Sequence, residues 1–240
     1  MLVFQKKLLI DNFNTMTDFH KILGFDDVYD KSLTFTLPLF KKLGIKQNHT
    51  IAAESWYYVD LLNKNGIKSS WSDIFSWIVN LAKSRYPNID FKVDDMRDFV
   101  LDKKVELITC MDWCINHVFS LKEVEETFQS VYNNLEDKWY FYFEFWTLEE
   151  VWNSKDYANE KNFVLEWYDI MQKERRFWNN IHNMLTVIKK DWEIIDILNA
   201  YHTSFDYDEV IRLLKNSWFK KYIEVPSSNN ITKNILAFKY

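Results

Sequence analysis

Short apolar runs and amphipathic stretches alternate through the central part of the chain. The apolar runs are bounded by turn residues, as strands are, and the stretches between them repeat apolar positions at three-to-four spacing, as helices do. The predicted strands span 49–53, 67–71, 89–93, 104–111 and 139–146, and the predicted helices span 56–66, 73–87 and 120–135. This alternation predicts an α/β fold in which a mostly parallel, doubly wound sheet carries helices on both faces.

Local signals mark where several of these helices begin and end. Asn65-Gly66 is a C-cap signal for the helix at 56–66, and Pro87 closes the next helix. Ser120 followed by Glu123 forms a capping box at the start of the helix at 120–135.

Two regions depart from the strand–helix alternation. Residues 1–47 have helical spacing, interrupted at Leu37-Pro38 and at Gly44, and predict a helical N-terminal cap. Residues 150–205 contain strand-like runs at 163–170, 183–190 and 193–205, which predict an antiparallel insertion with a hairpin turn at 190–193.

The end of the chain returns to the α/β pattern. A helix is predicted at 206–217, followed by strands at 218–225 and 234–240 that form an antiparallel edge pair. No linker or repeat divides the sequence, so we expect one domain over residues 1–240.

Composition excludes several classes of protein. The net charge of −5 gives no excess of positive charge with which to bind the phosphates of a nucleic acid. No apolar run reaches the roughly 18 residues of a transmembrane helix. The two cysteines, Cys110 and Cys114, cannot form a disulfide framework, and no cluster has metal-ligand spacing. We therefore expect a cytoplasmic protein without a structural metal.

Several short motifs, in order, resemble the class I S-adenosylmethionine-dependent methyltransferases, and most closely the glycine/sarcosine-methyltransferase type. The resemblance covers about residues 45–240. Its motifs are the segments GIKSSWSDIFSWIVNLAKSRYP (66–87), NIDFKVDDMRDF (88–99), VELITCMDWCINHV (105–118), KEVEETFQSVYNNL (122–135), DKWYFYFEF (137–145) and LLKNSWFKKY (213–222). The resemblance implies a Rossmann-like sheet of seven strands and S-adenosylmethionine as the cofactor.

The resemblance also implies which residues contact the cofactor. Asp73, just after the second predicted strand, corresponds to the acid that binds the ribose hydroxyls, and Asp95 and Met96 correspond to the turn that frames the adenine. A carboxylate accepts two vicinal hydroxyls well. The full set of expected cofactor contacts is Ala52, Ser55, Trp56, Asp73, Ile74, Asp95, Met96, Cys110, Met111 and Asp112.

Three further residues are candidates for contact with the methyl acceptor, which we expect to be a small molecule. His117 could orient the acceptor or take its proton near neutral pH. The simpler interpretation is a structural histidine whose ring nitrogens are hydrogen-bonded within the protein. Glu144 lies inside an aromatic strand, where a carboxylate needs a partner such as an amine substrate, an arginine or a lysine. His202 lies in the insertion that covers the substrate in the family.

The first loop departs from the glycine-rich pattern of the family. When the chain is aligned with the family at the second strand, Thr50 occupies the position of the family's acid. Glu54 and Trp56 occupy the positions of its two glycines. Glycine lets the backbone approach the cofactor closely. An indole at Trp56 would be expected to fill this crevice.

Tryptophan also replaces glycine elsewhere. The chain has eleven tryptophans and three glycines, where average usage of about 7% predicts roughly seventeen glycines. Trp71, Trp139 and Trp218 stand at glycine positions of the family, and Trp192 follows Asp191 at a hairpin tip that favours Asp-Gly. Either the fold has lost its cofactor, or some of these codons are UGA, which certain bacteria read as glycine.

Two functions follow from these alternatives. The first is S-adenosylmethionine-dependent methyl transfer to a nitrogen or oxygen nucleophile of a small molecule. The second is a catalytically inactive, methyltransferase-like protein that acts in binding or regulation, with exposed tryptophans as interaction hot spots.

Overall fold

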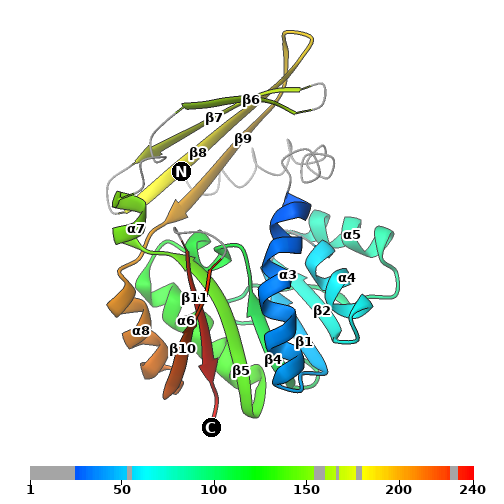
Figure 1. Ribbon diagram of the computed structural model, residues 1–240, viewed down its shortest axis with the longest axis vertical. Coiled ribbons are helices and arrows are strands. Elements are labelled where there is room, and N and C mark those ends of the chain that lie inside the picture. The colour runs from blue at the N-terminus through cyan, green and yellow to red at the C-terminus, as the bar shows by residue number, and fades with distance from the viewer. Residues whose placement is uncertain (1–24, 53–55, 154–159, 166–167, 177–179, 228–231) are drawn as a thin grey trace.

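A seven-stranded sheet forms the centre of the molecule in the computed structural model (Figure 1). The structure describes residues 25–52, 56–153, 160–165, 168–176, 180–227 and 232–240. The strand order is β10-β11-β5-β4-β1-β2-β3. The strands are β1 (Gln47–Ile51), β2 (Lys68–Asp73), β3 (Phe91–Val93), β4 (Val105–Cys110), β5 (Leu135–Trp146), β10 (Lys221–Val225) and β11 (Thr232–Phe238).

Strands β1 to β5 run parallel to one another, whereas β11 is antiparallel to both β5 and β10. The predicted mostly parallel sheet of seven strands, with an antiparallel pair at its edge, is therefore confirmed. Because β1 lies between β2 and β4, the chain changes direction across the sheet at β1, and loops diverge there at the carboxyl ends of the strands.

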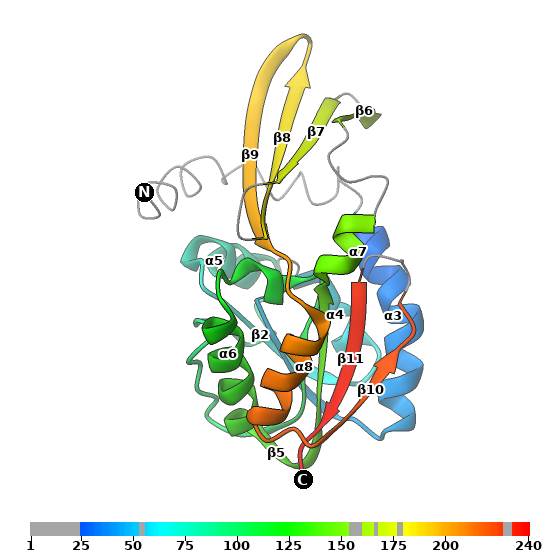
Figure 2. The same cartoon turned by 90° about the vertical axis from the view of Figure 1, so that its left-hand side faces the viewer.

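Helices cover both faces of this sheet (Figure 2). They are α3 (Phe25–Lys42), α4 (Trp56–Lys64), α5 (Ser76–Arg85), the 3-10 turn η2 (Cys114–His117), α6 (Leu121–Asn134), α7 (Leu148–Asn153) and α8 (Tyr207–Asn216). Alternate residues of a strand point to opposite faces. Phe141 and Phe143 of β5 accordingly join the core under α6 and α8, while Tyr142 joins the core under α3 and α4.

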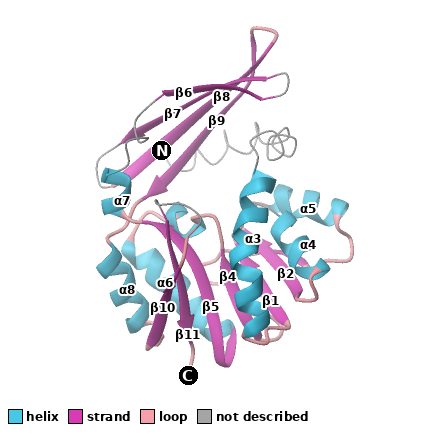
Figure 3. Cartoon of the chain, in the orientation of Figure 1, coloured by secondary structure: helices cyan, strands magenta, loops and turns pink. Residues whose placement is uncertain are grey.

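A second, four-stranded antiparallel sheet stands beyond one end of the first (Figures 1 and 3). Its strands are β6 (Glu160–Leu165), β7 (Tyr168–Arg176), β8 (Ile181–Lys190) and β9 (Glu193–Thr203). It is inserted after β5 and α7, so it lies at the carboxyl ends of the parallel strands. The predicted antiparallel insertion and its hairpin turn are both confirmed.

One detail of the insertion was predicted wrongly. The apolar run at 163–170 was expected to be one strand, but it is divided between β6 and β7, which pair with each other as a hairpin. An apolar run long enough for one strand also fits the ends of two paired strands, so periodicity does not reveal where one strand stops and the next begins.

The N-terminal cap contains a second correction. Leu37-Pro38 was expected to interrupt the helical pattern, yet α3 continues through Pro38 to Lys42. An internal proline costs a helix about 3 kcal/mol. Here Leu33 and Phe40, on either side of the proline, are both buried in the core shared with α4, which offsets that cost. Residues 1–24 of the predicted cap lie outside the described part of the chain.

Ser120 caps α6 as predicted, and Glu123 also reaches back, although to the N–H of the residue before the cap instead of to that of Ser120. The Ser120 hydroxyl accepts the Glu123 backbone N–H at 3.3 Å, and Glu123 Oε2 accepts the Phe119 backbone N–H at 2.8 Å. None of the helices within the described ranges has the length and apolar content needed to span a bilayer.

Replacing Ser120 with alanine is expected to destabilise the protein by about 1 kcal/mol, because the helix loses the acceptor for one of its unpaired N–H groups. Urea denaturation followed by circular dichroism measures this change. Ser84→Ala is the matched control, since Ser84 is exposed near the end of α5 and its hydroxyl only donates to the Leu81 carbonyl. Equal stability changes in the two variants would contradict the capping role.

Candidate functional site

Asp73 lies where the sequence analysis places the acid that grips ribose. It is the last residue of β2 and only 6% exposed. Its Oδ1 accepts the Phe75 backbone N–H at 2.9 Å, and its carbonyl accepts the Asp94 N–H at 3.0 Å. These contacts orient the carboxylate at the carboxyl edge of the sheet, whereas the neighbouring Ile74 is 41% exposed.

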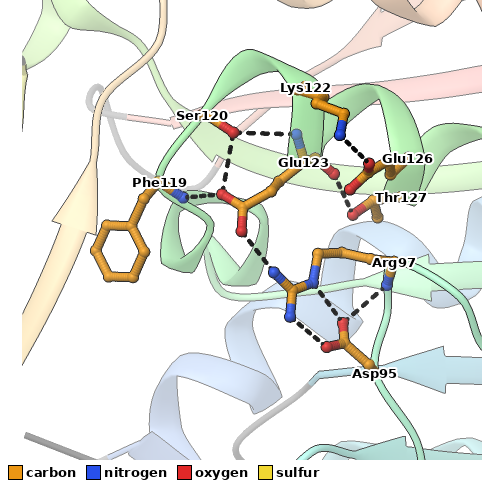
Figure 4. A network of polar contacts seen from close by, with 8 residues as sticks. All are labelled: Asp95, Arg97, Phe119, Ser120, Lys122, Glu123, Glu126 and Thr127. Carbon is orange, nitrogen blue, oxygen red and sulfur yellow. Dashed lines mark hydrogen bonds and ion pairs between the residues drawn. The ribbon is translucent and has the colours of Figure 1, made fainter. Parts of the chain in front are cut away.

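A network of charged side chains rigidifies the turn after β3 (Figure 4). The Arg97 guanidinium binds Asp95 through Nε–Oδ1 at 2.9 Å and Nη2–Oδ2 at 2.5 Å, and it binds Glu123 Oε1 at 2.5 Å. The two carboxylates raise the pKa of Arg97 further, with Asp95 contributing most. Because Glu123 belongs to the capping box of α6, this network ties the turn of Asp95 and Met96 to a helix terminus.

The loop after β4 is held by a buried carboxyl group. Glu144 Oε2 accepts the Asp112 backbone N–H at 3.1 Å, and its Oε1 accepts the Tyr142 hydroxyl at 3.0 Å. Burial raises the pKa of Glu144. Both oxygens therefore have protein donors, and Glu144 positions the loop that contains Asp112, while its contact with an acceptor remains a prediction. Cys110 and Met111 are fully buried.

The loops after β1 and β4 contact each other. Ala52 has a φ of +52°, its N–H donates to the Ser72 carbonyl at 2.9 Å, and its own carbonyl accepts a hydrogen bond from the Cys114 thiol. These loops flank the position where the chain changes direction across the sheet, which is where open α/β sheets bind ligands. Ser55, also predicted at this site, lies outside the described residues.

Trp56 does not occupy the position that the sequence led us to expect. Its indole is 6% exposed and packs with Val59, Trp71 and Ile78 in the core formed by α4, α5, β2 and β3. The Arg85 guanidinium lies over the ring, 5.3 Å from its centroid. The expectation that this indole fills the crevice is therefore wrong, because the first turn of α4 directs it into the helical layer.

Two predicted acceptor residues come together at the junction of the two sheets. His117 ends the turn η2 after β4, and His202 lies near the end of β9, where the insertion returns to the first sheet. Their ring centroids are 4.5 Å apart, and the His202 ring lies 5.2 Å from that of Trp146 at the end of β5. His117 is partly exposed, whereas His202 is only 3% exposed.

A third histidine, His182, was not identified from the sequence. It lies on β8 directly opposite His202, and its Nε2 is 2.7 Å from the Ser204 hydroxyl. Burial, and then the charges of His117 and His182, lower the pKa of His202 well below its usual value. A buried imidazole with a lowered pKa is neutral at physiological pH. Counting back along the hairpin from its turn places residue 181 opposite His202. A register shift at Ile188/Lys189 changes the partner by one residue, to His182.

Asn116 is a second residue whose role the sequence did not reveal. It is fully buried, and its amide donates to the carbonyls of Trp146 at 3.1 Å and Thr203 at 2.6 Å. Its Oδ1 accepts the Trp146 N–H at 2.9 Å. Asn116 thus joins the turn before His117 to the ends of β5 and β9. Within the described ranges, no group of histidine, cysteine and acidic side chains is arranged to hold a metal ion.

No family model matches the chain. In sequence, it is 32% identical over 76 residues to protein 235L of Invertebrate iridescent virus 6, whose name assigns it provisionally to the methyltransferases. That match covers 30% of this chain and 28% of the viral protein.

Solved structures share the whole architecture. An S-adenosylmethionine-dependent methyltransferase from Clostridium acetobutylicum ATCC 824 matches 95% of this chain and 98% of its own, with a TM-score of 0.78 and 14% identity. CalS10, an amino pentose methyltransferase from Micromonospora echinaspora, matches 89% of both chains with a TM-score of 0.72 and 14% identity. DesVI from Streptomyces venezuelae matches 98% of both, with a TM-score of 0.69 and 15% identity. The chain therefore has the Rossmann-like methyltransferase fold that its sequence resembles.

Proposed function

We propose that this chain transfers the methyl group of S-adenosylmethionine to a nitrogen or oxygen nucleophile of a small molecule. The observation that carries the proposal is Asp73, a buried carboxylate oriented at the carboxyl end of β2, beside the position where the chain changes direction across the sheet. Open α/β sheets bind their ligands at that position.

The residues at this edge suit the cofactor. A carboxylate at Asp73 matches two vicinal ribose hydroxyls, and the turn of Asp95 and Met96 has a backbone already fixed by Arg97. Thr50, which replaces the acid of the first loop, is buried and bonds the Thr109 hydroxyl at 2.9 Å, so it supports the sheet instead. Bound S-adenosylmethionine would supply an activated methyl group on a sulfonium.

Methyl transfer of this kind depends mainly on in-line positioning and the exclusion of water. We propose that residues 150–205 cover the acceptor and that residues 1–47 flank it within one domain. His117 and His202 then lie beside the acceptor, and His117, the more exposed of the two, takes the proton that an amine releases on methylation. The name of CalS10, an amino pentose methyltransferase, adds support for an amine acceptor.

Isothermal titration of the purified protein with S-adenosylmethionine tests the cofactor, and we expect saturable binding at micromolar concentrations. A panel of small amines and matched alcohols, assayed for release of S-adenosylhomocysteine, then tests the acceptor. We expect turnover with at least one amine. Absence of binding would reject the enzyme, whereas binding with turnover only on alcohols would reject the amine.

One observation favours the second candidate, an inactive binding protein. Trp192 is 93% exposed and Trp218 is 52% exposed, and exposed tryptophans are common in interaction hot spots. The titration above separates the two functions, because an inactive binding protein that has lost its cofactor gives no heat with S-adenosylmethionine.

A further inference from the structure

Three tryptophans of this chain adopt a backbone conformation that glycine favours. The angle φ is +58° at Trp113, +71° at Trp192 and +72° at Trp218. They are three of the eight non-glycine residues with positive φ in the described ranges, although tryptophan supplies only eleven of the 240 residues. This conformation brings the Cβ of an L-residue too close to the following carbonyl oxygen, and only glycine, asparagine and aspartate adopt it routinely.

The chain itself shows which residue the turn at Trp218 requires. Helix α8 ends in a Schellman motif, in which Phe219 N–H donates to the Leu214 carbonyl at 3.3 Å and Trp218 N–H donates to the Lys215 carbonyl at 3.1 Å. Such a motif needs a left-handed residue immediately after the helix cap.

Helices α3 and α4 end with the same pair of hydrogen bonds. At the left-handed position, α3 has Gly44, with a φ of +77°, and α4 has Gly66, with a φ of +84°. The same motif thus carries glycine twice and tryptophan once in a single chain. An indole at this position is the exception that requires an explanation.

The turn at Trp192 leads to the same conclusion by a different route. Lys190 pairs with Glu193, so Asp191 and Trp192 form a two-residue hairpin loop. Their φ values of +51° and +71° are those of a type I′ turn, for which Asp-Gly is among the strongly preferred sequences. The indole is 93% exposed, so little burial compensates for the strain.

Trp113 is the third case. It follows Asp112, whose φ is +55°, so two successive left-handed residues connect β4 to η2. Its indole contacts that of Trp146, with ring centroids 4.4 Å apart and ring planes inclined by 31°, and Trp146 in turn contacts His202.

We propose that Trp113, Trp192 and Trp218 are encoded by UGA, and that translation in the source organism inserts glycine at these codons. UGA differs from the tryptophan codon UGG only in its third base and is reassigned in several genetic codes, to tryptophan in some and to glycine in others. The natural chain then has glycine at all three left-handed turns. At position 113, glycine also uncovers the face of Trp146 beside the histidines.

Two direct measurements test this proposal. The nucleotide sequence is expected to read UGA at all three codons, and peptide mass spectrometry of the protein from its source organism is expected to find glycine there. A UGG codon or a tryptophan-containing peptide at any of the three positions would overturn it.

A matched pair of variants tests the physical argument independently. Trp192→Gly removes the Cβ that strains the turn, whereas Trp192→Ala removes the indole and keeps the Cβ. We expect Trp192→Gly to melt higher than Trp192→Ala by roughly 2–4 °C, the shift that corresponds to about 1 kcal/mol in a chain of this size. Equal melting temperatures would contradict a requirement for glycine.

Discussion

Replacing Asp73 with asparagine lowers the affinity for S-adenosylmethionine roughly 10- to 100-fold. A charge-assisted hydrogen bond contributes about 1.5–3 kcal/mol, and each 1.4 kcal/mol corresponds to about tenfold in affinity. Asparagine keeps the oxygen that accepts the Phe75 N–H, so the start of the turn before α5 survives. Isothermal titration measures the loss, and unchanged circular dichroism verifies that the fold persists.

Asp94→Asn is the matched control for this experiment. Asp94 adjoins Asp73 through a backbone hydrogen bond and is a partly buried carboxylate at the same edge of the sheet. The Asp94→Asn substitution removes the same charge from the same region as Asp73→Asn. A nonspecific electrostatic attraction between the protein and the sulfonium of the cofactor would therefore weaken equally in both variants. Equal affinities of the two variants would contradict a specific contact between Asp73 and the ribose.

Replacing Asn116 with alanine destabilises the protein by about 3 kcal/mol. The substitution removes three buried hydrogen bonds to the backbone of Trp146 and Thr203, and each such bond contributes about 1 kcal/mol. Urea unfolding at constant m-value measures the change. In the folded fraction, methyl transfer is expected to fall as well, because the turn that positions His117 loses its anchor on β5 and β9.

The control for this variant is Asn133→Ala on α6. Asn133 is exposed, so its replacement is expected to change stability by less than about 0.5 kcal/mol. If Asn116→Ala unfolds at the same urea concentration as this control, the buried amide does not hold the two sheets together.

The seven-stranded sheet could be predicted because its signals are local. Buried parallel strands are short apolar runs, and helix ends such as Asn65-Gly66 and Ser120 are specified by the residues themselves. The prediction that Pro38 interrupts the first helix was wrong, because packing outweighed the local preference of proline. Pro38 stays inside α3, where Leu33 and Phe40 on either side of it are buried.

The candidate site was predicted less completely. Asp73 ends β2 and Asp95 lies two residues after β3, and the carboxyl ends of parallel strands share one edge of a sheet, so their location follows from the strand order. Trp56 was placed wrongly, because its position in the sequence does not say which side of α4 its indole occupies. Asn116 and His182 were missed, since each acts through contacts with residues far along the chain.

The sequence by itself determined the class of fold, the succession of strands and helices, and the residues that end the parallel strands, because these depend on periodicity and on neighbours within a few positions. It also revealed that tryptophan stands at turns where glycine is expected. Only the tertiary structure decided that His117 meets His202, since the turn η2 and the end of β9 are far apart in the sequence and come together only in the folded chain. It likewise identified Trp113, Trp192 and Trp218, because the sign of φ is a property of the folded backbone.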